Sequence, residues 1–223
     1  MTRRCVALVL LATASFSCAA KPYDYTAYLT HMPKSILVLP PVNDSLEVQA
    51  SNAFLATVTR PLAERGYYVF PVAVVDAFLR QNGRPTPTDM HAVELEKLRD
   101  VFGADAALYI HIKDWGTSYQ ILSSSSRVVT ECRLVDLRTG SVLWTGRGVG
   151  VESSGSGGGG LAGMLANALV SQVVSSINDP CPELARRANQ ELFSSDRLGL
   201  LLGHRHPGYE EDQVRRRAAA PAK

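Results

Sequence analysis

The sequence predicts a single α/β domain in which helices pack on a mixed β-sheet. A continuous apolar run at Ile36–Leu39, followed by Pro40 and Pro41, is typical of a strand that is buried on both faces. Strand-like and helix-like segments then alternate as far as Ile112, an order that favours parallel strands joined by right-handed crossovers. From Trp115–Val151 the pattern becomes β-rich, which predicts that the sheet continues as an antiparallel meander.

The first helix of the domain is expected after Asp44. This residue has the character of an N-cap, with Glu47 three residues later as its capping-box partner. Apolar residues within Leu46–Leu62 recur at helical spacing, so they predict a helix face that packs on the sheet, and Gly66 ends the helix. The next strand is expected in Tyr67–Phe70.

Two further helices and a central strand complete this alternation. Val74–Leu79 carries the apolar face of one helix, and Asp89–Phe102 is expected to form a single amphipathic helix that ends at Gly103. Ala106–Ile112 is a nearly continuous apolar run and therefore predicts a central strand.

The β-rich part is expected to contain three strands with turns between them. The predicted strands are Thr117–Leu122, Arg127–Leu137 and Val142–Val149, and the predicted turns are Ser123–Ser126 and Arg138–Gly140. The alternation of apolar and polar residues in the second strand places Cys132 on its buried face.

The remainder of the chain is expected to add two helices and a tail. Ser153–Gly160 predicts a flexible linker rather than a phosphate-binding loop, because no Lys-Ser or Lys-Thr pair follows its glycines. Helices are predicted over Leu161–Ile177 and Pro182–Phe193. The first of them is expected to pack on the sheet, and an exposed oligomerisation or membrane-contact face is the alternative. Residues 196–223 are predicted to be a disordered C-terminal tail.

The amino terminus has the organisation of a signal peptide, which we assign to residues 1–17. Arg3 and Arg4 form a positive region, Cys5–Phe16 is mostly apolar, and small residues follow. As a helix the apolar region spans roughly 18 Å, well below the roughly 30 Å of a bilayer core, so cleavage is expected rather than permanent insertion.

The run that ends at Cys18 resembles a bacterial lipobox. Ser17 supplies the small residue before the cysteine, so cleavage between them would leave Cys18 as the lipidated first residue, with acyl chains such as palmitate. Ala19 favours sorting to the outer membrane. Residues 18–34 are then predicted to be a tether and residues 35–195 the domain. The alternative is ordinary cleavage near Ala14 or Ser17, which would release a soluble periplasmic protein.

Composition and motifs point away from several classes of function. The formal net charge is only +2 at pH 7, so no nucleic-acid partner is expected. His91 and Glu94 could share a helix face, and His204 and His206 lie in the predicted tail, but neither pair completes a metal site. We therefore predict no catalytic residues, no metal and no cofactor.

Two cysteines stay in the mature domain, Cys132 and Cys181. In an oxidising periplasm they could form a disulfide that closes a loop of about 50 residues. The alternative is two free thiols, because a bridge requires the helix after Pro182 to pack on the same sheet face as Cys132.

Three stretches carry a resemblance to a known family: residues 35–45, residues 61–75 and residues 134–144, together with Phe102–Ala106. They resemble the outer-membrane lipoproteins typified by a meningococcal surface-antigen candidate, over roughly residues 18 to 195. More distantly they are similar to the TolB N-terminal domain, the curli-secretion lipoprotein CsgG and the lipoprotein activators of peptidoglycan synthases. The resemblance implies a shared TolB N-terminal-like (CsgG-like) α/β fold and not a shared activity.

These observations together predict a non-enzymatic lipoprotein, anchored in the cell outer membrane by its lipid and facing the periplasm. Its partners would be other envelope proteins, as an accessory of a transport or secretion assembly. One alternative is an oligomeric curli-type secretion subunit, which requires a long amphipathic β-hairpin and would make the protein a homo-oligomer. The other alternative is an activator of a peptidoglycan synthase.

Overall fold

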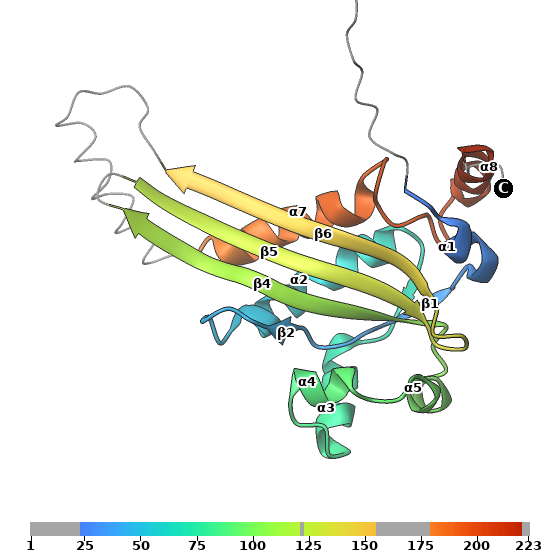
Figure 1. Ribbon diagram of the computed structural model, residues 1–223, viewed down its shortest axis with the longest axis horizontal. Helices are drawn as coiled ribbons and strands as arrows, with labels where there is room; N and C mark the ends of the chain where they lie inside the picture. Colours follow the sequence, from blue (N-terminus) through green and yellow to red (C-terminus); the bar gives the residue numbers. More distant parts are fainter. Residues whose placement is uncertain (1–22, 121–122, 155–178, 220–223) are drawn as a thin grey trace, which may run out of the picture.

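The computed structural model describes residues 23–120, 123–154 and 179–219 and confirms the predicted fold class. Helices pack on one mixed β-sheet (Figure 1). The strands are β1 (Ser35–Val38), β2 (Val42–Asn43), β3 (Tyr68–Val69), β4 (Ala106–Gln120), β5 (Ser123–Asp136) and β6 (Val142–Ser154). The helices are α1 (Thr26–His31), α2 (Ala50–Glu64), α3 (Val72–Gln81), α4 (Pro87–His91), α5 (Leu95–Phe102), α7 (Cys181–Ser194) and α8 (Tyr209–Ala219).

The sheet is parallel at one side and antiparallel at the other. Its order is β3-β1-β4-β5-β6, and the short β2 pairs with β4. β1 runs parallel to β3 and to β4, because the intervening chain returns through helices. β4, β5 and β6 form an antiparallel meander, so β6 is the edge strand of the described sheet.

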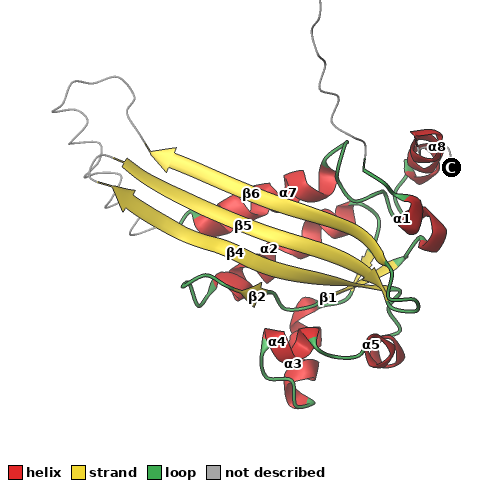
Figure 2. Cartoon of the chain, viewed as in Figure 1, coloured by secondary structure: helices red, strands yellow, loops and turns green. Residues whose placement is uncertain are grey.

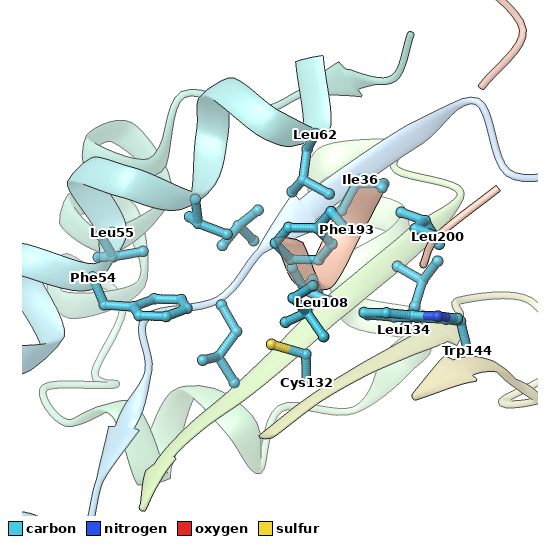
Figure 3. Close-up of a cluster of buried hydrophobic side chains, with 14 of the residues drawn as sticks. Ile36, Phe54, Leu55, Leu62, Leu108, Cys132, Leu134, Trp144, Phe193 and Leu200 are labelled. Carbon is cyan, nitrogen blue, oxygen red and sulfur yellow. The ribbon is translucent and has the colours of Figure 1, made fainter. Parts of the chain in front are cut away.

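Strand β1, which lies between β3 and β4, is buried on both faces, as the sequence predicts. Ile36 and Val38 belong to a core formed with α1, α2 and α7, whereas Leu37 belongs to a second core formed with α3, α4 and α5. Figure 3 shows the first core, where residues of β1, β4, β5 and β6 meet helix residues such as Phe54 and Phe193.

The helices cover the two faces of the sheet unequally. α2 and α7 extend along one face of the long meander, whereas α3, α4 and α5 gather below the end near β1 (Figure 2). The far half of β4, β5 and β6 is therefore covered by described helices on one face only. Among the described strands, none pairs with the outer side of β6.

The meander strands are longer than predicted. Thr117 and its neighbours continue β4 instead of forming a separate strand, and Ser123–Ser126 belong to β5 instead of a turn. An irregularity between Ile112 and Asp114 gives β4 one extra residue there and allows pairing to resume beyond it. The serines are accommodated in part because the Ser126 hydroxyl lies 2.8 Å from that of Thr117.

The predicted capping box at Asp44 is wrong. Asp44 instead forms an ion pair with Lys113 of β4, at 2.7 Å, and α2 begins only at Ala50. The side chain of Asn43 organises the preceding loop by accepting hydrogen bonds from the backbone and hydroxyl of Ser45. Leu46, predicted on the packed helix face, is fully exposed in this loop.

The single helix predicted over Asp89–Phe102 is in fact two helices, α4 and α5. Thr86 starts α4 because its hydroxyl accepts a hydrogen bond from the Asp89 backbone N–H, and Asp89 completes the capping box. Glu94 has an extended backbone conformation, with ψ of 137°, which separates α4 from α5.

The folded domain also extends beyond the predicted tether and tail boundaries. Tyr28 of α1 is buried and hydrogen-bonds to Tyr67, whose hydroxyl donates to the Leu201 carbonyl at 2.6 Å. Leu200 and Leu201 are fully buried, and α8 follows them. A few aromatic and leucine anchors hold these polar segments in place, which average hydrophobicity does not reveal.

Candidate functional site

Several residues of the predicted sites lie outside the described residues. These are the predicted signal peptide with Ser17, the lipidation residue Cys18, and the helix predicted over Leu161–Ile177 together with most of its linker. Among the helices that the structure describes, none combines the length and apolar character needed to cross a bilayer.

The two mature cysteines are both buried and both free. Cys132 lies opposite Ile110 of β4, whereas Cys181 interacts with Thr117 and Gly116 of the same strand. These positions are about 20 Å apart along β4 at 3.3 Å per residue, and a disulfide needs Cα atoms within about 7 Å. Of the two predicted alternatives, a disulfide or two free thiols, the structure therefore has two free thiols.

Burial makes both thiols unreactive. Desolvation raises the pKa of Cys132 to about 12. The pKa of Cys181 is also raised to about 12, first by burial and then by the carboxylate of Asp179. Neither cysteine therefore has the lowered pKa that nucleophilic catalysis requires.

The histidines are not brought together as a metal site. His91 hydrogen-bonds through Nε2 to the Pro40 carbonyl at 2.9 Å, and burial lowers its pKa to about 4, so it is neutral at physiological pH. The ring of His111 lies beside it at 5.6 Å between centroids. Within residues 23–120, 123–154 and 179–219, no group of three His, Cys, Asp or Glu side chains could hold a metal ion.

A hollow of about 850 Å³ lies around the edge of β6 and is here called the edge hollow. Residues of β4 and β5 line it on one side, residues of α7 line it on the other, and β6 lies between them. The residues lining it are Tyr23, Tyr109, His111, Lys113, Glu131, Cys132, Arg133, Thr145, Gly146, Arg147, Gly148, Val149, Ala188, Glu191, Leu192, Ser195 and Leu198.

Tyr23 closes one end of the β6 edge. The backbone N–H of Thr145 donates to the Tyr23 hydroxyl at 2.8 Å and therefore points away from β5. In an antiparallel ladder alternate residues direct their backbone groups to the same side, and pairing is regular from Thr145 to Ser154. The N–H and C=O groups of Arg147, Val149 and Val151 consequently point outward too.

Three alternate glycines bring α7 unusually close to β6. A Cβ added to Gly150 would lie 2.9 Å from the Leu184 carbonyl oxygen, and one added to Gly146 would lie 2.6 Å from Leu192. Gly148 lies between them, under the Ala188 carbonyl. Glycine is required at these positions because α7 packs closely on β6. The α7 side of the edge hollow therefore lies directly beside the strand.

The sheet wall of the edge hollow is polar and carries mixed charge. Arg133 lies over the Tyr109 ring at 5.4 Å, and burial raises the pKa of the Tyr109 hydroxyl, so the ring stays neutral. Glu131 and Arg147 lie opposite each other on β5 and β6. No ion pair within 4.0 Å involves Arg147 among the residues that the structure describes.

The edge hollow combines groups suited to binding an extended chain. Its floor offers outward backbone groups and the 45% exposed side chain of Val149, and its sheet wall offers cations beside Glu131. In the described chain, no hydroxyl or thiol lining it hydrogen-bonds to a histidine or carboxylate side chain. The sequence contained one signal of this feature, the alternation of Gly146, Gly148 and Gly150, which our sequence analysis missed.

Comparison with known proteins gives consistent matches. Residues 23–205 match the family model described as "Putative lipoprotein GNA1162-like". The chain is 42% identical over 209 residues to the "Putative lipoprotein NMB1124/NMB1162" of Neisseria meningitidis serogroup B, covering 93% of this chain and 96% of the relative.

Solved structures also match. The crystal structure of lipoprotein GNA1162 from Neisseria meningitidis is 48% identical, with a TM-score of 0.53, and covers 64% of this chain and 99% of its own. A PelC dodecamer from Paraburkholderia phytofirmans matches at 12% identity with a TM-score of 0.44, over 78% of this chain and 93% of its own.

Proposed function

Because this chain belongs to the GNA1162-like lipoprotein family, we propose that it is a non-enzymatic lipoprotein of the outer membrane whose folded domain faces the periplasm and binds other envelope proteins. In this role it serves as an accessory of a transport or secretion assembly. The edge hollow is the observation that supports a binding role, because it contains outward backbone groups and the exposed Val149 along an edge that no described strand pairs with.

The export and anchoring steps rest on the amino-terminal sequence. The basic and apolar regions direct export, cleavage after Ser17 exposes Cys18, and acylation of Cys18 anchors the chain. Each buried methylene of the acyl chains contributes about 0.8 kcal/mol, so several chains together hold the protein on the membrane. Ala19 directs it to the outer membrane.

The start of the folded domain limits how far the protein stands from the membrane. Tyr25 is already buried and its hydroxyl donates to the Gly199 carbonyl. The segment from Cys18 to Tyr25 can span at most about 25 Å when fully extended. The proposed lipid anchor therefore keeps the domain close to the bilayer surface, and the working tether is shorter than residues 18–34.

Membrane fractionation with intact-mass analysis tests the anchor. We expect wild-type protein in the outer-membrane fraction with the added mass of acyl chains, and Cys18→Ala without that mass and released from the membrane. Cys5→Ala is the matched control, because it changes a cysteine inside the predicted signal peptide. Ala19→Asp is expected to shift the protein to the inner membrane. A soluble, unmodified wild-type protein would contradict the proposal.

Chemical crosslinking of intact envelopes tests the binding role. We expect the full-length lipoprotein to recover the same envelope protein in repeated preparations, and Cys18→Ala to recover less of it because the protein is no longer concentrated at the membrane. Recovery of no reproducible partner would argue against an accessory role.

A second candidate function is an oligomeric secretion subunit of the curli type. The favouring observation is the length of the β4–β5 hairpin, with strands of 15 and 14 residues. Against it, α7 packs along one face of the meander, so that face cannot join a barrel wall without losing the helix. Light scattering of the acylated protein in detergent decides between them, because a secretion subunit must be oligomeric and an accessory can be a monomer.

A further inference from the structure

Within residues 23–120, 123–154 and 179–219, the edge of β6 has no pairing strand and can act as a template for strand pairing. Residues Arg147, Val149 and Val151 direct their backbone N–H and C=O groups away from β5, and no described strand pairs with them. Val149 and Val151 are 45% and 56% exposed, although valine is otherwise a typical residue of half-buried strands. Soluble proteins usually protect such an edge with charges, prolines or a covering element.

We propose that β6 binds an extended segment of another envelope protein as an additional strand of the sheet. This inference deepens the proposed function by naming the surface and the kind of partner. The shape of the edge hollow supports it, because the hollow has walls on both sides of β6. A strand laid beside β6 directs alternate side chains to the two faces of the sheet, so it occupies both sides at once.

The extent of the site follows from its two ends. Tyr23 already occupies the Thr145 N–H and stops pairing there. Pairing can continue through the outward positions Arg147, Val149 and Val151 to the end of β6 at Ser154. This length accommodates about seven residues of the bound segment at 3.3 Å per residue.

The side chains define the chemistry of the bound segment. On one face an acidic residue pairs with Arg147, which lacks an ion-pair partner in the described chain, and apolar residues cover Val149 and Val151. On the other face the bound side chains lie beside α7, where Ala188 and Leu192 line the edge hollow. The partner segment therefore alternates apolar residues and contains a carboxylate.

A second copy of β6 satisfies these requirements less well. In any two-fold antiparallel pairing of β6 with itself, Arg147 faces Val149, Val151, Ser153 or another arginine, because directly opposed residues share one face of the sheet. None of these residues is acidic, so self-pairing adds no carboxylate beside Arg147 beyond Glu131, which lies opposite it on β5. The charge pattern thus favours a different polypeptide over self-association.

Photo-crosslinking from the strand edge tests the proposal in cells that export the full-length lipoprotein. Benzoylphenylalanine is placed at Val151, and at Val74 of α3 or Val101 of α5 as exposed control positions away from β6. We expect an adduct from position 151 that mass mapping assigns to one extended segment of an envelope protein, and none with that segment from positions 74 and 101.

Two substitutions at Val149 then distinguish strand pairing from simple proximity. Val149→Pro removes the outward N–H, and edge strands tolerate proline, so the adduct is expected to fall at least tenfold. Val149→Thr keeps the N–H and the β-branched shape and is expected to retain the adduct. Should the proline variant fold poorly by circular dichroism, Val149→Lys keeps the N–H and places a charge against the incoming strand, with the same expected loss.

Three results would overturn the inference: an adduct that Val149→Pro and Val149→Lys leave unchanged, adducts only from the control positions, or an adduct with the mass of two copies of this chain. Adducts from the control positions alone would leave the proposed function intact and reject only the edge site. No adduct from any position would count against both.

Discussion

The backbone N–H of Thr145 donates a hydrogen bond to the hydroxyl of Tyr23 at 2.8 Å, so an aromatic side chain at the start of the domain covers part of its edge strand. This contact joins residues 122 positions apart at an exposed site. It fixes where the open edge of β6 begins, and it explains why strand pairing with a partner is expected only beyond Thr145.

Tyr23→Phe is expected to open this end of the edge. The variant loses one exposed hydrogen bond, worth about 1 kcal/mol, so amide hydrogen exchange at Thr145 should accelerate about fivefold. Global stability should change little, because water can replace the hydroxyl. Tyr68→Phe, at an exposed tyrosine of β3, is the control and should leave Thr145 exchange unchanged. Unaltered exchange in Tyr23→Phe would show that the contact is not maintained in solution.

Gly150→Ala is expected to destabilise the domain by about 1–3 kcal/mol. The added methyl would lie 2.9 Å from the Leu184 carbonyl oxygen, a backbone atom that can move only if α7 moves. Gly208→Ala is the control, because its methyl would meet only ordinary contacts at 3.5 Å and beyond. Urea unfolding measures both variants, and equal stability would mean that α7 does not pack tightly on β6.

The tyrosine pair Tyr28 and Tyr67 is expected to make the protein sensitive to alkali. Burial raises the pKa of Tyr67 well above its ordinary value of 10.0, and burial likewise raises that of Tyr28. A raised folded pKa stabilises the fold below the unfolded pKa, so the free energy of unfolding should fall from about pH 10 upward. Tyr67→Phe should weaken this dependence and cost about 1–3 kcal/mol at pH 7, because the buried Leu201 carbonyl loses its donor. A pH-independent stability up to pH 11 would contradict this.

The sequence predicted those structural features that depend on the local pattern of apolar and polar residues. The apolar run at Ile36–Leu39 predicted a doubly buried strand, and alternation predicted the burial of Cys132; both are confirmed. The capping box at Asp44 failed because Lys113, distant in sequence, pairs with that carboxylate. A local motif cannot reveal that Lys113 pairs with Asp44, because the two residues come into contact only when β2 pairs with β4.

The candidate site was harder to predict for a related reason. The edge hollow depends on which strand ends the sheet and on how closely α7 approaches it, and both are properties of the tertiary fold. The buried Tyr28 and Leu201 lie in segments whose mean polarity predicted a tether and a tail. Single anchors contribute little to an average over a window, although their burial can stabilise a fold by about 2 kcal/mol each.

Thr130→Val is expected to stabilise the protein by about 1 kcal/mol. Thr130 is fully buried on the face that α7 covers, and its hydroxyl has no hydrogen-bond partner among the described residues. Replacing an unpaired buried hydroxyl with a methyl group removes a desolvation penalty. Thr117→Val is the contrasting control, because it breaks the contact with the Ser126 hydroxyl and should destabilise. Lower stability of Thr130→Val in urea would indicate that an internal water satisfies the hydroxyl.

Both mature thiols are expected to stay free and protected. With pKa values of about 12, Cys132 and Cys181 have a thiolate fraction of about one in ten thousand at pH 8, and burial blocks access as well. Iodoacetamide should therefore leave both unmodified in the native protein and label both after denaturation without a reductant. The denatured sample is the control for reagent activity. A crosslinked Cys132–Cys181 peptide in non-reducing mass spectrometry would contradict the structure, because the two residues contact positions about 20 Å apart along β4.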